Sequence, residues 1–477
     1  MFQVSTATLP QICQRWLGLQ AGKDHRSPIQ RIPSRLLLGI LNRAVHPVEA
    51  SHLIKFTHQG SLIHPSEAKW DFDATDLRES RKNALTLTLV CRDWYLIGTE
   101  ILYSRPFLDS DIAIERFYQT VKARPQICRL VRDLYLDRIH TLNFQTRLHP
   151  GSTIIHGIGT YYRLKRNIDD IITYCSDIKS ILTVGDDGAH TVTSLLLNRI
   201  LDIHNPPLSL RQLILHVDKL HNLRRTSGLT FPTLEVLSLR QGTIHHRAVA
   251  DLASFPRLRT LQLAHIILDR SDLATFANCT REVAPFLNTL QVFEVSFRNV
   301  EYFTMRLPNI FENLTLVGPR QLQCFMTKPL AASTDMQSVR HLVVGVVSSP
   351  ALYIADQWRI PESLESLTVF VNIPDDDVYR LRLREQNVMM LDMLRDCFHN
   401  NLTARGEKLS LREVVLNLSN YPPCDPLQRV LVDAALYDIE ALCETWNIMI
   451  SVRALDIEIW ATEQLSVHLT KWVDPSW

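Results

Sequence analysis

The 477-residue chain lacks the features that commit a protein to a disulfide scaffold, a zinc ribbon or a membrane. Its nine cysteines are scattered between Cys13 and Cys443, and no two of them form a C-x-x-C pair. This spacing argues against disulfides and zinc, and it favours a reducing compartment, cytoplasmic or nuclear. No apolar run reaches the length of a membrane span, and residues 1–20 have neither the basic start nor the apolar core of a signal peptide.

The chain also lacks a charge imbalance and the common linear motifs of enzymes. Its 51 basic and 50 acidic residues leave a formal net charge of +1, which provides no electrostatic footprint for nucleic acid or an anionic membrane. Only 15 glycines are present, and the motifs G-x-x-x-x-G-K-[ST], H-E-x-x-H and G-x-S-x-G do not occur. We therefore predict a non-catalytic protein with no catalytic residues, no cofactor and no metal. An enzyme with a dispersed site is the least favoured alternative.

Two polar clusters could suggest metal binding, but their spacing favours loops and turns. Four histidines recur every six residues without a cysteine, a step that does not keep them on one helical face: His46, His52, His58 and His64. Residues 185–188 (GDDG) lack the spaced carboxylates and distal glutamate of a calcium loop, so they indicate a turn. Asp375–Asp377 follow a proline and are placed to cap a helix.

What the chain does contain is a repeated frame. Residues 231–239 and 255–263 share the pattern F-P-x-L-x-x-L-x-L, 24 residues apart. In a chain that is 46% apolar, the shorter frame h-x-x-h-x-h matches about a tenth of start positions by chance, so only its ordered recurrence is informative. We place eleven such frames, beginning at Val131, Ile178, Leu210, Leu234, Leu258, Leu290, Phe311, Val339, Leu364, Leu411 and Val452.

The frame and its period resemble leucine-rich repeats, in which each unit is one strand followed by a helix or turn. Helical patterns occur between frames at 247–255, after Pro374 and after Pro426. Strand, helix and strand in succession imply a parallel sheet with helices on one face. The predicted fold is therefore α/β, with an irregular solenoid over residues 106–477 whose frame aliphatic residues face inward. The last helix is expected to present Leu431, Ala435, Ile439 and Leu442 as its apolar face.

Residues 29–105 differ in character, and 1–28 precede them as an extension. Pro33 marks a helix start, and Leu36, Leu37, Ile40 and Leu41 then recur at helical spacing. A second helical region is expected at 84–103, carrying Val90, Cys91 and Trp94. Ile32-Pro33 with the following helix, and Val90-Cys91-Arg92-Asp93-Trp94, resemble the two signatures of the F-box, a short helical module. Residues 45–83 are then an insertion within it.

The resemblance implies a function. F-box proteins dock onto the Skp-type adaptor, and through it a cullin, of a ubiquitin ligase, while their repeats hold the protein to be ubiquitinated. The implied adaptor-binding residues are Pro33, Leu36, Leu37, Ile40, Leu41, Val90, Cys91 and Trp94. For Cys91 and Trp94, burial within the module is favoured over direct contact. The alternative is an interaction scaffold in which these helices only cap the open end of the solenoid.

Overall fold

A computed structural model describes the fold of most of the repeat region and of part of the N-terminal region. The described residues are 36–38, 40–41, 54–57, 69–72, 74–90, 92–136, 154–183, 209–216, 230–269, 273–293, 295–298, 311–317, 337–346, 360–371, 380–405, 408–418 and 426–455. Pro33, Cys91, the four spaced histidines, the GDDG segment and Asp375–Asp377 lie outside them, so the predictions made for those residues are not tested.

Most of the strands form one long parallel sheet. It has 13 strands, and neighbours in the sheet follow each other along the chain, except that β10 pairs with β8 beside the main path. The strands are β3 (Phe107–Leu108), β4 (Asp133–Leu136), β5 (Ser180–Thr183), β6 (Gln212–His216), β7 (Val236–His245), β8 (Thr260–Asp269), β9 (Thr289–Phe293), β10 (Ser296–Arg298), β11 (Asn313–Val317), β12 (His341–Val346), β13 (Ser366–Val371), β14 (Glu413–Leu418) and β15 (Met449–Ala454).

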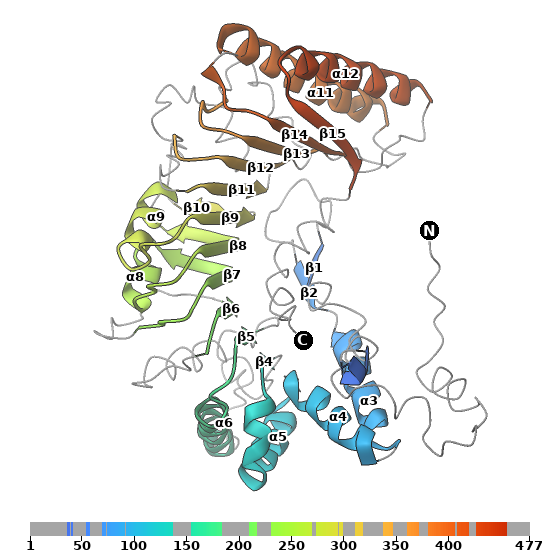
Figure 1. The fold of residues 1–477 in the computed structure, drawn as a ribbon. Helices are drawn as coiled ribbons and strands as arrows, with labels where there is room; N and C mark the ends of the chain where they lie inside the picture. Colours follow the sequence, from blue (N-terminus) through green and yellow to red (C-terminus); the bar gives the residue numbers. More distant parts are fainter. Residues whose placement is uncertain are drawn as a thin grey trace, which may run out of the picture.

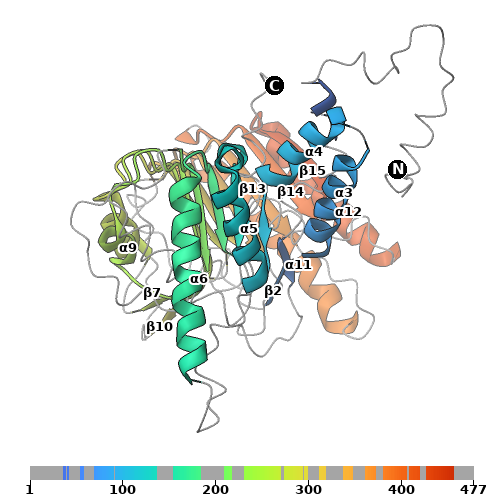
Figure 2. The ribbon, with the colours of Figure 1, turned by 90° about the horizontal axis from the view of Figure 1, so that it is seen from below.

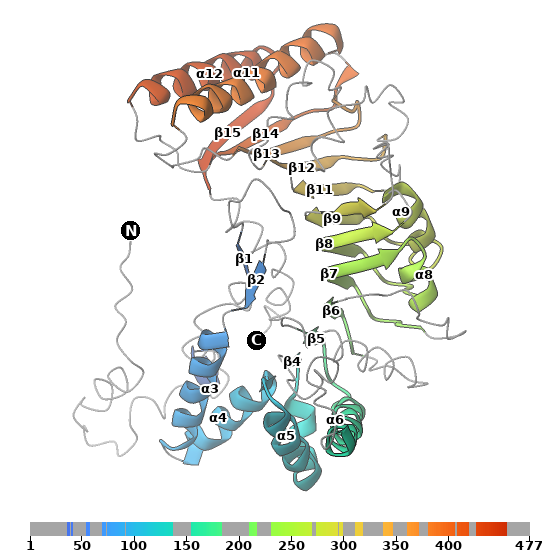
Figure 3. The same cartoon turned by 180° about the vertical axis from the view of Figure 1, so that it is seen from behind.

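Helices cover the outer face of this sheet, which bends into an arc (Figure 1). They are α5 (Asp111–Ala123), the 3₁₀ helix η4 (Pro125–Leu130), α6 (Ile154–Tyr174), α8 (Ala248–Leu252), α9 (Leu273–Arg281), α11 (Arg380–Arg405) and α12 (Pro426–Thr445). Helices α5 and α6 lie side by side (Figure 2), as do α11 and α12 at the opposite end (Figure 3). Parallel strands in chain order with helices on one side confirm the predicted α/β class.

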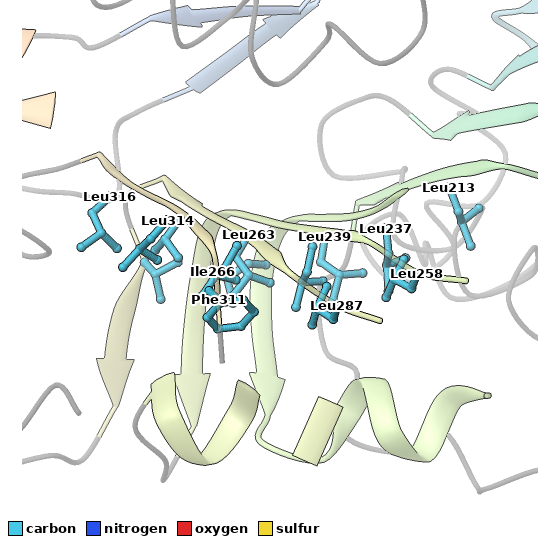
Figure 4. Packing of buried hydrophobic residues seen from close by; sticks show 14 of the residues in the cluster. Leu213, Leu237, Leu239, Leu258, Leu263, Ile266, Leu287, Phe311, Leu314 and Leu316 are labelled. Atoms are coloured by element: carbon cyan, nitrogen blue, oxygen red, sulfur yellow. The ribbon is translucent and has the colours of Figure 1, made fainter. Parts of the chain in front are cut away.

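The frame residues explain why the sheet forms in this register. Leu213, Leu237, Leu261 and Leu290 occupy equivalent positions in successive strands and are fully buried. Because side chains alternate along a strand, the frame sends its aliphatic residues to the helical side of the sheet (Figure 4). They join one apolar core that runs from Leu108 to Ile448. The strand pairing confirms nine of the eleven predicted frames.

Two predicted frames are out of register, one by three residues and the other by five. Leu290 pairs with Leu261, so it is the second apolar position of its frame and not the first. The error arises because Phe293 and Val295 are also apolar and buried, so a frame that begins at Leu290 matches the pattern as well as the true one does. In the last frame Ile450 pairs with Val414, so the predicted start at Val452 is its third position.

A hydroxyl group just before each of several frames ties one repeat to the preceding one. In each case the hydroxyl donates to the backbone carbonyl of the first frame residue in the preceding repeat. The donor and carbonyl residues are Ser209 and Ile178 (2.7 Å), Thr233 and Leu210 (2.8 Å), Ser338 and Phe311 (3.1 Å), and Ser363 and Val339 (2.9 Å). These bonds satisfy backbone acceptors at the edge of the core.

The N-terminal region forms a separate helical unit. It contains α3 (Ala74–Thr88) and α4 (Arg92–Ser104), and an antiparallel pair of strands, β1 (Ile54–Thr57) and β2 (Lys69–Phe72), lies at the open side of the arc (Figures 1 and 3). The predicted helical region at 84–103 is helical over 84–88 and 92–103, but a turn at Leu89 and Val90 divides it between the two helices. A Cβ on Gly98 would lie 3.0 Å from Thr88, so this glycine lets α4 fold back closely against α3.

Candidate protein-binding surfaces

The inner face of the sheet carries the side chains that lie between the frame residues. Its first row crosses neighbouring strands as Thr289, Asn313, His341, Ser366 and Glu413. The next row, two residues further along each strand, is Gln291, Thr315, Val343, Thr368 and Val415. Hydroxyl and amide groups therefore predominate where the opposite face of the same strands is aliphatic.

These rows line a groove of about 400 Å³ that extends from β9 to β15. Across its floor Gln262 Nε2 donates to Gln291 Oε1 (2.7 Å), and Asn313 Nδ2 donates to Thr289 Oγ1 (3.2 Å). These bonds between neighbouring strands fix the orientation of the polar side chains before any partner arrives. We call this surface the polar groove.

The carboxylate and the guanidinium of the polar groove lie on its last two strands, β14 and β15. Glu413 begins β14 and accepts a long hydrogen bond from Ser366 Oγ (3.4 Å). Arg453 is exposed on β15 opposite Asn417, four residues further along the strand than Glu413, which corresponds to about 13 Å. Asn417 is buried, and its Oδ1 has no hydrogen-bond donor among the described residues. The groove therefore offers an acid and a guanidinium to a polar partner.

The second surface belongs to the N-terminal helices. A small apolar cluster, distinct from the core of the sheet, holds them together, and its buried members are Leu37, Leu41, Ala84, Leu87, Trp94 and Ile101. Several large apolar side chains of the same unit remain exposed, and these are Leu36, Ile40, Leu85, Leu89, Val90, Tyr95 and Leu96. We call the unit formed by 36–41, α3 and α4 the helical module.

The structure divides the predicted adaptor-binding residues into two groups. Leu36 and Ile40 are 58% and 48% exposed, and Val90 is also exposed in the turn between α3 and α4. Leu37 and Leu41 are 8% and 7% exposed and pack inside the helical module with Trp94. Leu37 and Leu41 therefore belong to the internal packing of the module, and the i, i+4 pair that faces outward is Leu36 and Ile40, one residue earlier. The adaptor contact of Leu37 and Leu41 stays a prediction.

The buried thiols are not poised for chemistry. Cys128, Cys175, Cys397 and Cys443 are buried thiols that form no disulfide, and burial raises the pKa of each, in the case of Cys443 to about 11. A thiol that stays protonated at neutral pH is a weak nucleophile. Within the described ranges, no group of three or more His, Cys, Asp or Glu side chains could hold a metal ion.

None of the helices in the described part of the chain combines the length and the hydropathy needed to cross a bilayer. Comparison with known proteins assigns the chain to no family, since no family model and no curated protein matches it. The polar groove and the helical module therefore have to be interpreted from their own chemistry.

Sequence reasoning located the helical module but not the polar groove. The groove residues follow no periodic pattern of their own, because they occupy the variable positions of the frame. The one available signal was that the positions between frame residues from Leu287 to Leu418 are rich in Thr, Ser, Asn and Gln.

Proposed function

We propose that this chain is a substrate-receptor subunit of a cullin–RING ubiquitin ligase. In this proposal the helical module docks the Skp-type adaptor, and the polar groove holds the protein to be modified. The observation that carries the proposal is the construction of the helical module. It has an apolar cluster of its own, yet it leaves Leu36, Ile40, Leu89 and Leu96 on its surface.

Exposed aliphatic side chains of this kind favour a partner that buries them. Complete burial of one such side chain stabilises a complex by about 1.5–3 kcal/mol, before the costs of association. A few neighbouring aliphatic residues can therefore dominate the binding energy of an interface. The proposal assigns no bond chemistry to the chain, whose part is to hold two proteins near each other.

The test is binding of purified full-length chain to a purified Skp-type adaptor. We expect the wild-type chain to form a stable complex, and the double substitution Leu36→Gln with Ile40→Gln to weaken it by at least about tenfold per side chain. Because both residues are already exposed, the thermal melting temperature should not change. Ile112→Gln on α5, 64% exposed, is the matched control and should bind the adaptor like the wild type. A wild-type chain that does not bind the adaptor contradicts the proposal.

The alternative function is an interaction scaffold whose helical module only caps the sheet. One observation favours it: the module leads directly into the first repeat, since the Ser104 carbonyl at the end of α4 accepts the Arg132 N–H (2.8 Å). In this case the adaptor does not bind, whereas Leu37→Ala with Leu41→Ala still lowers stability by about 2–5 kcal/mol per residue through cavities in the module. Because Leu37 and Leu41 are buried in the module under either function, the adaptor assay is the measurement that separates the two.

A further inference from the structure

Helix α12 has two apolar faces, although only one of them packs on the sheet. The inner face is buried in the core and consists of Val432, Ala435, Leu436, Ile439 and Cys443. The other face is exposed and consists of Leu427, Val430, Ala434, Tyr437 and Ala441. Leu427, Val430 and Tyr437 are 62%, 64% and 71% exposed, so none of the described elements covers them. We call these five residues the α12 stripe.

The spacing of the α12 stripe is that of a coiled-coil seam. Its members follow one another at steps of three, four, three and four residues. At 3.6 residues per turn this places them in one line about 21 Å long, on roughly the opposite side of the helix from the buried face. A surface that only needed solubility would carry polar residues there.

The sizes of the side chains suit a second helix. The large residues Leu427, Val430 and Tyr437 are interspersed with the small residues Ala434 and Ala441. Small residues along a seam leave holes into which the side chains of a facing helix insert, while the large ones enter the holes of the partner. This pattern favours a helix over a flat surface as the occupant.

The charges beside the stripe define the partner further. If Leu427 and Val430 are the a and d positions, Asp433 and Glu440 are g positions and Asp438 is an e position. Arg429 lies near Asp433 (3.8 Å), and Arg395 of α11 lies near Asp438 (3.5 Å), so two of these acids have local counter-ions. The border of the stripe nevertheless carries more acidic than basic groups on α12, and e and g charges select the partner in coiled coils.

We propose that the α12 stripe is a docking site for an amphipathic helix of another protein, with lysine or arginine bordering its apolar seam. A second copy of this chain would bring Asp433, Asp438 and Glu440 against the same acids, which opposes self-association. The α12 stripe lies on the outer side of the arc at the end opposite the helical module (Figure 1). It can therefore be occupied at the same time as the polar groove and the module, and it does not depend on the function proposed for them.

The probe that tests this site is a synthetic three-heptad peptide with Leu at a and d and Lys at e and g. Its own association is opposed by repulsion between lysines. In a fluorescence-anisotropy titration with the full chain, we expect this peptide to bind and its counterpart with Glu at e and g to bind at least about tenfold more weakly. Leu427→Gln and Tyr437→Gln should each weaken binding of the Lys peptide by about tenfold.

Ile112→Gln on α5 is the matched exposed control, at 64% exposure, and should leave binding unchanged. Equal binding of the two peptides, or binding that survives both stripe substitutions, contradicts the proposal. Sedimentation of the chain alone gives the other outcome: self-association that Tyr437→Gln abolishes would show that a second copy occupies the stripe. Binding of the wild-type chain to anionic vesicles that is lost in Leu427→Gln would assign the stripe to a membrane and also overturn the proposal.

Discussion

At the scale of single residues, the second apolar position of each frame determines which face of the sheet is buried. Leu213, Leu237, Leu261, Leu290 and Leu314 lie in one row across neighbouring strands, and each is at most 2% exposed. Because side chains alternate along a strand, a register error of one residue would turn the whole row to the inner face. These leucines therefore fix both the strand pairing and the position of the polar groove.

Leu261→Asp is expected to unfold the array around it. The substitution buries a carboxylate without a partner and leaves a cavity, with an expected cost of more than about 4 kcal/mol. Arg257→Asp, at an exposed position in the same repeat, is the control and should stay within about 0.5 kcal/mol of the wild type. Urea denaturation followed by circular dichroism measures both. If Leu261→Asp keeps the wild-type midpoint, the register of the frame is wrong.

The sequence was informative about these residues wherever the frame was unambiguous. It failed at Leu290 because two overlapping frames are both apolar there, and only the pairing with Leu261 distinguishes them. It failed at the last frame because Asn447 occupies the first position. Asn447 has a φ of 56° just after α12, a conformation that asparagine tolerates and that ends the helix. A polar helix-ending residue therefore replaced the expected aliphatic one.

At the scale of elements, hydrogen bonds that cannot be predicted from a hydrophobic pattern join neighbouring repeats. The hydroxyls of Ser209, Thr233, Ser338 and Ser363 each donate to a carbonyl in the preceding repeat.

The helices were also predicted only in part by the hydrophobic pattern. Periodicity did not reveal the turn at Leu89 and Val90 that separates α3 from α4. The helical spacing of Leu431 did not reveal that this residue is exposed on α12, contrary to its predicted place on the apolar face. Periodicity finds a helix, but two opposed apolar stripes leave its buried side undetermined.

Thr233→Val tests the contribution of the hydroxyl bonds. The new side chain keeps the shape of threonine but leaves the Leu210 carbonyl without its donor, so stability should fall by about 1 kcal/mol. Ser363→Ala should lose a similar amount at the Val339 carbonyl. Thr445→Val is the control, because its hydroxyl bonds only to Ala441 within an exposed helix end. An unchanged urea midpoint for both Thr233→Val and Ser363→Ala would exclude a role for these bonds in holding the repeats together.

At the scale of the whole molecule, three surfaces of different chemistry lie on one curved scaffold. The polar groove is on the inner face, the α12 stripe is on the outer face at one end, and the helical module is at the other end (Figure 1). The continuous core makes the sheet one body, whereas the module has a small cluster of its own. A partner bound to the module is therefore expected to leave the sheet unaltered.

Hydrogen–deuterium exchange of the full chain, with and without the Skp-type adaptor, tests the central claim most directly. The proposed docking predicts slower exchange in the second half of α3, in the following turn and in α4, where Leu89 and Leu96 are exposed. It predicts unchanged exchange in β11–β14, which remain free to hold a target. Exchange that the adaptor leaves unchanged in α3 and α4, or that it slows only in the sheet, would contradict adaptor docking through the helical module.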